Sequence, residues 1–211
     1  MLASDNFRIK FIGHVQIQDV TDAMEFPTFD ESGAITNGVM VCDKYNAIHP
    51  ENMSLAIAQS MSGLLSSNGK SYGAISEMRF GNGGTTILGN SRVLYKKPRT
   101  TSIGGLYSET YVKKINKNTS TGVDDSFNYV TAYHIPGQIF SDIICVCTLG
   151  LSEPADQSAS SSTALDGKYA FDELSLYSTA GNPLTHIVFY PVEKSANKVL
   201  QIKYTIRVQM V

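Results

Sequence analysis

One serine of this chain stands in a spacing that hydrolases use for a nucleophile. Residues 69–73 read Gly-Lys-Ser-Tyr-Gly, which matches the pattern G-x-S-x-G around Ser71. In hydrolases this pattern forms a sharp turn from a strand into a helix, which presents the serine oxygen beside backbone N–H donors. Here the hydrophobic pattern predicts a helix before the motif and a strand after it. We therefore interpret the motif as a helix-to-strand turn, with an esterase acting through Ser71 as the minor alternative.

Two glycine-containing stretches have the residue types of phosphate-binding loops. Residues 69–71, Gly-Lys-Ser, match the end of such a loop, but Leu64 stands where its first glycine is required. Residues 81–85 read Gly-Asn-Gly-Gly-Thr, but Thr86 replaces the last glycine of a dinucleotide fingerprint and no helix is predicted to follow. We interpret 81–85 as a flexible turn between two strands and predict no cofactor.

The potential metal ligands and acid–base groups are scattered along the sequence. A zinc site needs three or four converging ligands, and no such spacing occurs among the histidines. Paired acids at 124–125 and 172–173 are adjacent, so a strand would point the members of each pair to opposite faces. Cys145 and Cys147 lie in an apolar run and, with Cys42, are interpreted as inert buried thiols. No catalytic, cofactor-binding or metal-binding residue is predicted; the four histidines are His14, His49, His134 and His186.

Charge is low overall but uneven along the chain. The formal net charge is −2, which argues against nucleic acid as a specific ligand. Residues 92–117 nevertheless carry a formal charge of +6, whereas residues 1–31 contain six acidic residues and only two basic ones. We interpret the basic segment as a solvated or protein-facing patch that complements an acidic neighbour, which could be a second copy of the chain, with phosphate contact as the alternative.

The hydrophobic pattern predicts one helix and many strands. Pro50, the acidic residue after it and apolar residues at helical spacing predict a helix over 50–66. Alternation predicts a first strand from Phe7 to Ile17 with a bend at Gly13, followed by a loop over 19–38 and a short apolar run at 39–42. Further strands are expected near 72–80, 91–96, 106–114, 128–134 and 139–149. The run 152–167 is expected to be a long polar loop.

The end of the chain, residues 169–211, is predicted to form three consecutive antiparallel strands. In the last of them, apolar residues at even positions from 200 to 210 alternate with polar ones, which indicates a half-buried strand. Residues 184–192 are apolar on both faces, as in a central strand. The alternation slips across Asp172 and Glu173, which predicts a bulge there.

These patterns predict a mostly β protein, an antiparallel, jelly-roll-like β-sandwich with one amphipathic helix near residues 50–66. The 211 residues are expected to form a single domain over 1–211, with an N-terminal strand and loop arm over 1–45. Neither a secretory signal nor a membrane span is predicted.

Three segments of the C-terminal part carry a family resemblance. They are Phe-Asp-Glu-Leu-Ser-Leu-Tyr at 171–177, Thr-His-Ile-Val-Phe-Tyr-Pro-Val-Glu-Lys at 185–194, and Tyr-Thr-Ile-Arg-Val at 204–208, together with Met-Arg-Phe-Gly-Asn-Gly-Gly-Thr at 78–85. In them the chain resembles virion structural proteins of tailed bacteriophages, of the neck, collar and tail-adaptor type found in podovirus-like phages, the crAss-like group among them. The matching segments cover about a seventh of the chain.

The resemblance implies a non-enzymatic structural subunit of a phage virion, forming part of an oligomeric ring or adaptor in the neck or tail region. The implied partners are further copies of the chain in a cyclic homo-oligomer and other virion proteins such as portal, tail or fibre components. The implied location is the virion, assembled in the host cytoplasm, with no membrane partner. The alternative is a carbohydrate- or receptor-binding jelly-roll module of a tail fibre or head decoration.

Overall fold

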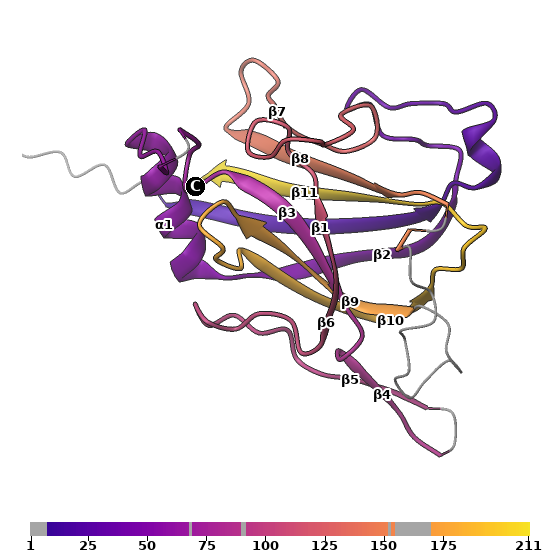
Figure 1. Ribbon diagram of the computed structural model, residues 1–211. Coiled ribbons are helices and arrows are strands. Elements are labelled where there is room, and N and C mark those ends of the chain that lie inside the picture. The colour runs from indigo at the N-terminus through magenta and orange to yellow at the C-terminus, as the bar shows by residue number, and fades with distance from the viewer. Residues whose placement is uncertain (1–7, 68, 90–91, 152, 155–169) are drawn as a thin grey trace, which may run out of the picture.

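A computed structural model describes residues 8–67, 69–89, 92–151, 153–154 and 170–211 of the chain. Within them the protein is mostly β, and nine strands form one curled antiparallel sheet in the order β6-β3-β9-β10-β2-β1-β11-β8-β7 (Figure 1). A separate small hairpin is formed by β4 and β5. The strands are β1 (Ile9–Asp19), β2 (Val39–Ile48), β3 (Ile75–Gly81), β4 (Thr85–Ile87), β5 (Val93–Tyr95), β6 (Glu109–Lys114), β7 (Tyr129–Tyr133), β8 (Phe140–Leu149), β9 (Ala170–Ser178), β10 (Thr185–Glu193) and β11 (Leu200–Met210).

The curl turns the one sheet into a sandwich, because its two halves pack on a shared core. Phe80 of β3 and Phe171 of β9 lie with ring centroids 4.8 Å apart. They share one buried cluster with Cys147 of β8 and Tyr204 of β11, which come from the other half of the sheet. Glu153, just after β8, bonds Lys113 of β6 and so links the two ends of the curl. The predicted fold, a jelly-roll-like antiparallel sandwich, is confirmed.

The helix α1 (Pro50–Met61) is shorter than the predicted 50–66. Pro50 opens it, as predicted, but the chain leaves helical geometry at Gly63, whose φ is +67°. Only its first turns are buried, through Asn52, Met53 and Ala56, whereas Met61 is 85% exposed. Among the described residues, no helix is long and apolar enough to cross a membrane.

The first two strands lie in the middle of the sheet and do not form a peripheral arm. β1 pairs with β11 over its whole length and with β2 on its other side. Its pairing with β11 passes through Gly13 without a shift in register. A side chain at Gly13 would collide with Asn46 of β2, so close approach explains this glycine. The predicted N-terminal strand and loop arm over 1–45 contains β1 and most of β2, which continues to Ile48 and pairs there with Thr185 of β10.

The three C-terminal strands follow one another along the chain as β9, β10 and β11, as predicted, but they are not all neighbours in the sheet. β9 and β10 are neighbours, whereas β2 and β1 lie between β10 and β11. The predicted central position of β10 is confirmed, and its residues 185–189 are all buried. The expected irregularity does occur at Asp172 and Glu173, but the extra residues belong to β10, since Val188 and Val192 face Glu173 and Phe171.

The loop between β1 and β2 folds over the outer face of the sheet. Ile35 and Val20 are buried there, and the backbone N–H of Ile35 donates to the side chain of Gln201 on β11 at 2.7 Å. We call residues 22–31 of this loop the acidic arm. The predicted polar loop at 152–167 lies outside the described residues, apart from residues 153 and 154.

The fold predicts how the three thiols react. Cys145 and Cys147 are completely buried, which raises the pKa of both. Burial also raises the pKa of Cys42 to about 11. At about pH 8.5 we expect Cys42 to react with iodoacetamide on the order of a hundredfold more slowly than a free thiol, and Cys145 and Cys147 not to react until denaturant is added. Peptide mass spectrometry measures all three; rapid labelling of Cys145 in the folded protein would contradict this packing.

Candidate functional site

The most concentrated group of buried polar side chains comes from β9 and β10. Asp172 and Glu173 are adjacent on β9, and His186 stands near the start of β10. His186 and Glu173 are fully enclosed, with Nε2 of the ring 3.0 Å from Oε2 of the carboxylate. Buried charges are costly unless they are paired and hydrogen-bonded, so the partners of these groups decide what the cluster does.

Glu173 accepts hydrogen bonds from two loops as well as from the histidine. Its Oε1 accepts backbone N–H groups of Gly83 at 3.1 Å and Ser108 at 2.8 Å, and its Oε2 accepts that of Tyr107 at 2.9 Å. Burial alone would raise the pKa of Glu173, but the bonds from His186 and from the backbone lower it below its ordinary value. The carboxylate therefore fastens the segments around residues 83 and 107 to the sheet.

The glycine-rich turn at 81–85 surrounds carboxylates of its own chain. The N–H groups of Gly84 and Thr85 donate to Asp172 at 2.8 Å and 2.7 Å, and the hydroxyl of Thr85 donates at 2.5 Å. Successive N–H groups of this kind form anion-binding concavities, and here Asp172 is the anion. Burial raises the pKa of Asp172, and these bonds offset the rise only in part. The prediction of a turn between two strands is confirmed, since residues 81–85 connect β3 to β4.

Both ring nitrogens of His186 are hydrogen-bonded, so neither is free to take a proton from a nucleophile. Its Nδ1 accepts the backbone N–H of Arg99 at 2.8 Å, so the proton lies on Nε2, which donates to Glu173. A hydrolase would need a serine or cysteine at the nitrogen that Arg99 occupies. His49 lies nearby, with Nδ1 2.9 Å from the carbonyl of Thr101, and burial lowers its pKa. Both histidines thus hold the segment 99–101 against the sheet.

The other candidate residues are not brought together. Ser71 follows α1 and precedes β3, as the helix-to-strand interpretation predicted, and its hydroxyl is buried. His14 bonds Asp43 at 2.6 Å on the outer face of the sheet, and His134 contacts the carbonyl of Phe140 at 3.1 Å. Within the described residues, no group of three or more His, Cys, Asp or Glu side chains could hold a metal ion.

The basic segment divides into two parts. Lys113 and Lys117 form ion pairs with Glu153 and Asp125. By contrast, the exposed stretch 95–107, which we call the basic strap, carries Lys96, Lys97 and Arg99 and contains no acidic residue. The strap is anchored through Tyr107, whose hydroxyl donates to the carbonyl of Lys97 at 2.9 Å. The predicted charged patch therefore divides into lysines that are paired within the chain and the three cations of the strap, with Lys114 exposed outside the strap.

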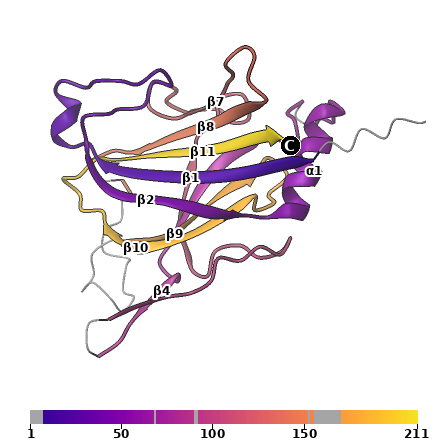
Figure 2. The ribbon, with the colours of Figure 1, turned by 180° about the vertical axis from the view of Figure 1, so that it is seen from behind.

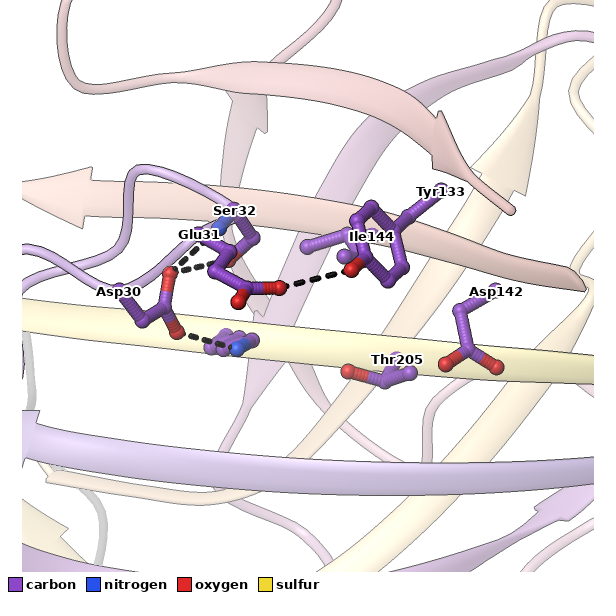
Figure 3. A pocket seen from close by; sticks show the side chains of 8 residues that line it. Asp30, Glu31, Ser32, Tyr133, Asp142, Ile144 and Thr205 are labelled. Atoms are coloured by element: carbon purple, nitrogen blue, oxygen red, sulfur yellow. Dashed lines mark hydrogen bonds and ion pairs between the residues drawn. The ribbon is translucent and has the colours of Figure 1, made fainter. Parts of the chain in front are cut away.

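A surface cleft of about 290 Å³ lies where the acidic arm meets the outer face of the sheet (Figure 3). Glu31 of the arm accepts the hydroxyl of Tyr133 at 2.7 Å, and Asp30 accepts Lys203 at 2.5 Å. Asp142 and Thr205 line the floor, as Figure 3 shows. The cleft thus combines one aromatic ring with three carboxylates, which is a polar arrangement.

The most exposed apolar feature of the sheet is the first part of β2. Residues 39–46 include the β1-paired part of β2, whereas β10 pairs with β2 only at Ala47 and Ile48. Within the described part of the chain, residues 39–46 therefore have no strand on their second side. Val39 is 69% exposed and Tyr45 is 74% exposed. An open apolar strand edge is a template for pairing with another chain, and nothing in the sequence distinguished this strand from a covered one.

Comparisons of the chain with protein-family models, curated proteins and solved structures found no match.

Proposed function

We propose that this protein is a non-enzymatic structural subunit of a phage virion, forming part of an oligomeric ring or adaptor in the neck or tail region. The observation that carries the proposal is the open edge of β2, which is apolar over residues 39–42 and carries charge only at Asp43 and Lys44. A protein that works alone usually blocks such an edge with charge, proline or a covering segment. The edge supports assembly with other chains, and the resemblance of residues 171–194 and 204–208 supports a virion as the assembly.

The chemistry of the buried cluster agrees with a structural role. The hydrogen bonds of this cluster go to loops of the same chain: Gly84 donates to Asp172, Tyr107 donates to Glu173, and Arg99 donates to His186. Such a network fixes the positions of the strap and of the glycine-rich turn, and a rigid frame is what a building block needs. The implied partners are further copies of the chain and neighbouring portal, tail or fibre proteins.

The β2 edge gives the proposal a direct test. We expect the double change Val39→Lys with Val41→Lys to raise the protein concentration needed for half-assembly by about tenfold or more, because two charges enter an apolar contact. The matched control is Ile135→Lys with Ile139→Lys, which also replaces two exposed apolar residues, in the turn between β7 and β8. Mass photometry across a dilution series measures the effect. Wild-type assembly by the β2 variant would exclude this edge as a contact.

The cleft of Figure 3 favours a second candidate function, a carbohydrate- or receptor-binding module of a tail fibre or head decoration. Tyr133 lies beside Asp142 and Glu31, and sugar sites combine an aromatic face with carboxylate acceptors. A glycan array probed with the wild-type protein separates the two candidates. Binding that is lost in Asp142→Ala would favour the module, and a silent array would remove it.

A further inference from the structure

We propose that successive copies of this chain bind one another through the basic strap of one copy and the acidic arm of the next. The inference rests on the proposed function, since it names the contact by which the subunits would assemble. The partner is a second copy of the chain, because the two surfaces carry opposite charges and lie apart on one copy.

The basic strap presents three cations that no carboxylate of the described chain neutralises. Arg99 and Lys96 both stack on Tyr107, with the guanidinium carbon 4.0 Å and the ammonium nitrogen 4.6 Å from the ring centroid. Arg99 also donates to the carbonyl of Leu106 at 3.2 Å, and Lys96 to that of Gly83 at 2.7 Å. Lys97 is exposed beside them. The cations are therefore held in place and stay available to carboxylates from outside.

The acidic arm presents the complementary surface. Asp22 and Glu25 are exposed and form no ion pair in the described part of the chain. Phe26 beside them is 76% exposed. The arm is nevertheless fixed on the body of the protein, because Asp30 accepts both the hydroxyl of Ser32 at 2.6 Å and the ammonium of Lys203 at 2.5 Å. An anchored surface that combines acids with an exposed aromatic ring is suited to a protein partner with cations and apolar groups.

Apolar groups accompany the cations of the strap as well. Ile103 is 93% exposed, and Tyr95 at the start of the strap is about half exposed. Both surfaces therefore offer exposed apolar side chains as well as charged ones. Charge complementarity would set which surfaces meet, and the apolar contacts would add affinity.

The strap and the arm lie too far apart on one copy to contact each other. The arm lies over β7 and β11, where its residues contact Tyr133 and Lys203. The strap is fixed to β10 through His186. The views from both sides show the arm and the strap at opposite sides of the molecule (Figures 1 and 2). A contact between unlike surfaces repeats from copy to copy and closes as a ring when the rotation allows.

Charge exchange tests this contact. The strap variant is Lys96→Glu with Lys97→Glu, and the arm variant is Asp22→Lys with Glu25→Lys. The control is Lys10→Glu with Lys114→Glu, two exposed lysines outside the strap that change the net charge as the strap variant does. Circular dichroism and thermal unfolding establish that each variant folds. Mass photometry then measures the concentration for half-assembly, for each variant alone and for an equal mixture of strap and arm variants.

We expect each interface variant alone to need about tenfold more protein for half-assembly, and the mixture to return close to the wild-type value, since each reversed surface then meets its complement. The wild type should also assemble less well as NaCl rises from about 0.05 M to about 0.5 M, because salt screens the charges. If the wild type assembles but both variants match the control, or the mixture does not recover, this contact is wrong and the proposed function stands. A wild type that stays monomeric would overturn both.

Discussion

Replacing Glu173 with alanine is expected to lower the free energy of unfolding by about 3–5 kcal/mol, because several buried donors lose their acceptor. Three backbone N–H groups and the ring of His186 would lose their acceptor at once. Each buried donor left unpaired costs about 1–3 kcal/mol. Equilibrium unfolding in urea measures the change. Protease cleavage within residues 95–107 should also become faster, because this carboxylate holds Tyr107 directly and Arg99 through His186.

The conservative variant Glu173→Gln keeps one oxygen and separates packing from charge. Its carbonyl can still accept from Gly83 and Ser108, but an amide nitrogen would then face the N–H groups of Tyr107 and His186. We expect an intermediate loss of about 2–3 kcal/mol. Glu51→Gln, at the exposed start of α1, is the control and should cost about 1 kcal/mol or less. A loss below about 1 kcal/mol in Glu173→Ala would contradict the role assigned to this side chain.

Acidification is expected to destabilise the protein progressively below about pH 5. Six carboxyl groups have pKa values lowered by their surroundings in the folded state. In Asp30, burial alone would raise the pKa, but hydrogen bonds from Lys203 and Ser32 lower it further than burial raises it. Hydrogen bonding lowers the pKa of exposed Asp43, mainly through His14. The six are Asp19, Asp30, Asp43, Asp125, Glu153 and Glu173.

The direction of the effect follows from proton linkage. A carboxyl group whose pKa is lower in the folded state stabilises the fold above its unfolded pKa, about 3.9 for Asp and 4.3 for Glu. That contribution is lost as the pH falls through the folded pKa. Asp172 acts in the opposite sense, because burial raises its pKa and protonation then favours the folded state. Because six carboxyl groups lose stabilising interactions on protonation and, among the described residues, only Asp172 gains, the free energy of unfolding decreases in acid.

Urea unfolding at about pH 7, 5, 4 and 3 measures this dependence. We expect the urea midpoint to fall between pH 5 and pH 3, and to fall less steeply in Lys203→Met, which removes an ion pair that lowers the pKa of Asp30. Lys10→Met, at an exposed site on β1, is the control and should follow the wild type. A midpoint that stays constant or rises on acidification would be inconsistent with these surroundings.

Local pattern predicted the fold class and most of the elements. Alternation located β11 almost to the residue, and a run that is apolar on both faces identified β10 as a central strand. These predictions succeeded because side-chain burial in a sheet follows directly from the two-residue period. The end of α1 was missed because Gly63 ends the helix, while apolar residues continue at helical spacing through Leu65 and remain exposed.

Long-range pairing could not be predicted in the same way. Strands 184–192 and 200–210 are adjacent in sequence, yet β2 and β1 insert between them. The partners of Glu173 are equally remote, since Gly83 and Tyr107 lie 90 and 66 residues away along the chain. The adjacent acids indicated only an irregular strand. Their role became visible once the glycine-rich turn, which resembles a phosphate loop in composition, was seen to surround them.

The open edge of β2 was also invisible in the sequence. Residues 39–42 read as a short apolar run of the kind found in covered strands, and no local signal shows that β10 diverges after His186. Exposure of an apolar strand depends on its neighbours in the sheet and on other chains. The charge asymmetry between residues 1–31 and 92–117 was a sequence signal for contact between copies, beside the family resemblance.

Mass determination by light scattering after size exclusion, over a wide range of loading concentrations, tests the assembly of this protein most directly. A structural subunit with an open strand edge and complementary charged surfaces should elute as one discrete species whose mass is a whole multiple of 23.0 kDa, with smaller species appearing on dilution. A monomer of 23.0 kDa at every concentration, unchanged by the β2 and charge variants, would contradict self-assembly.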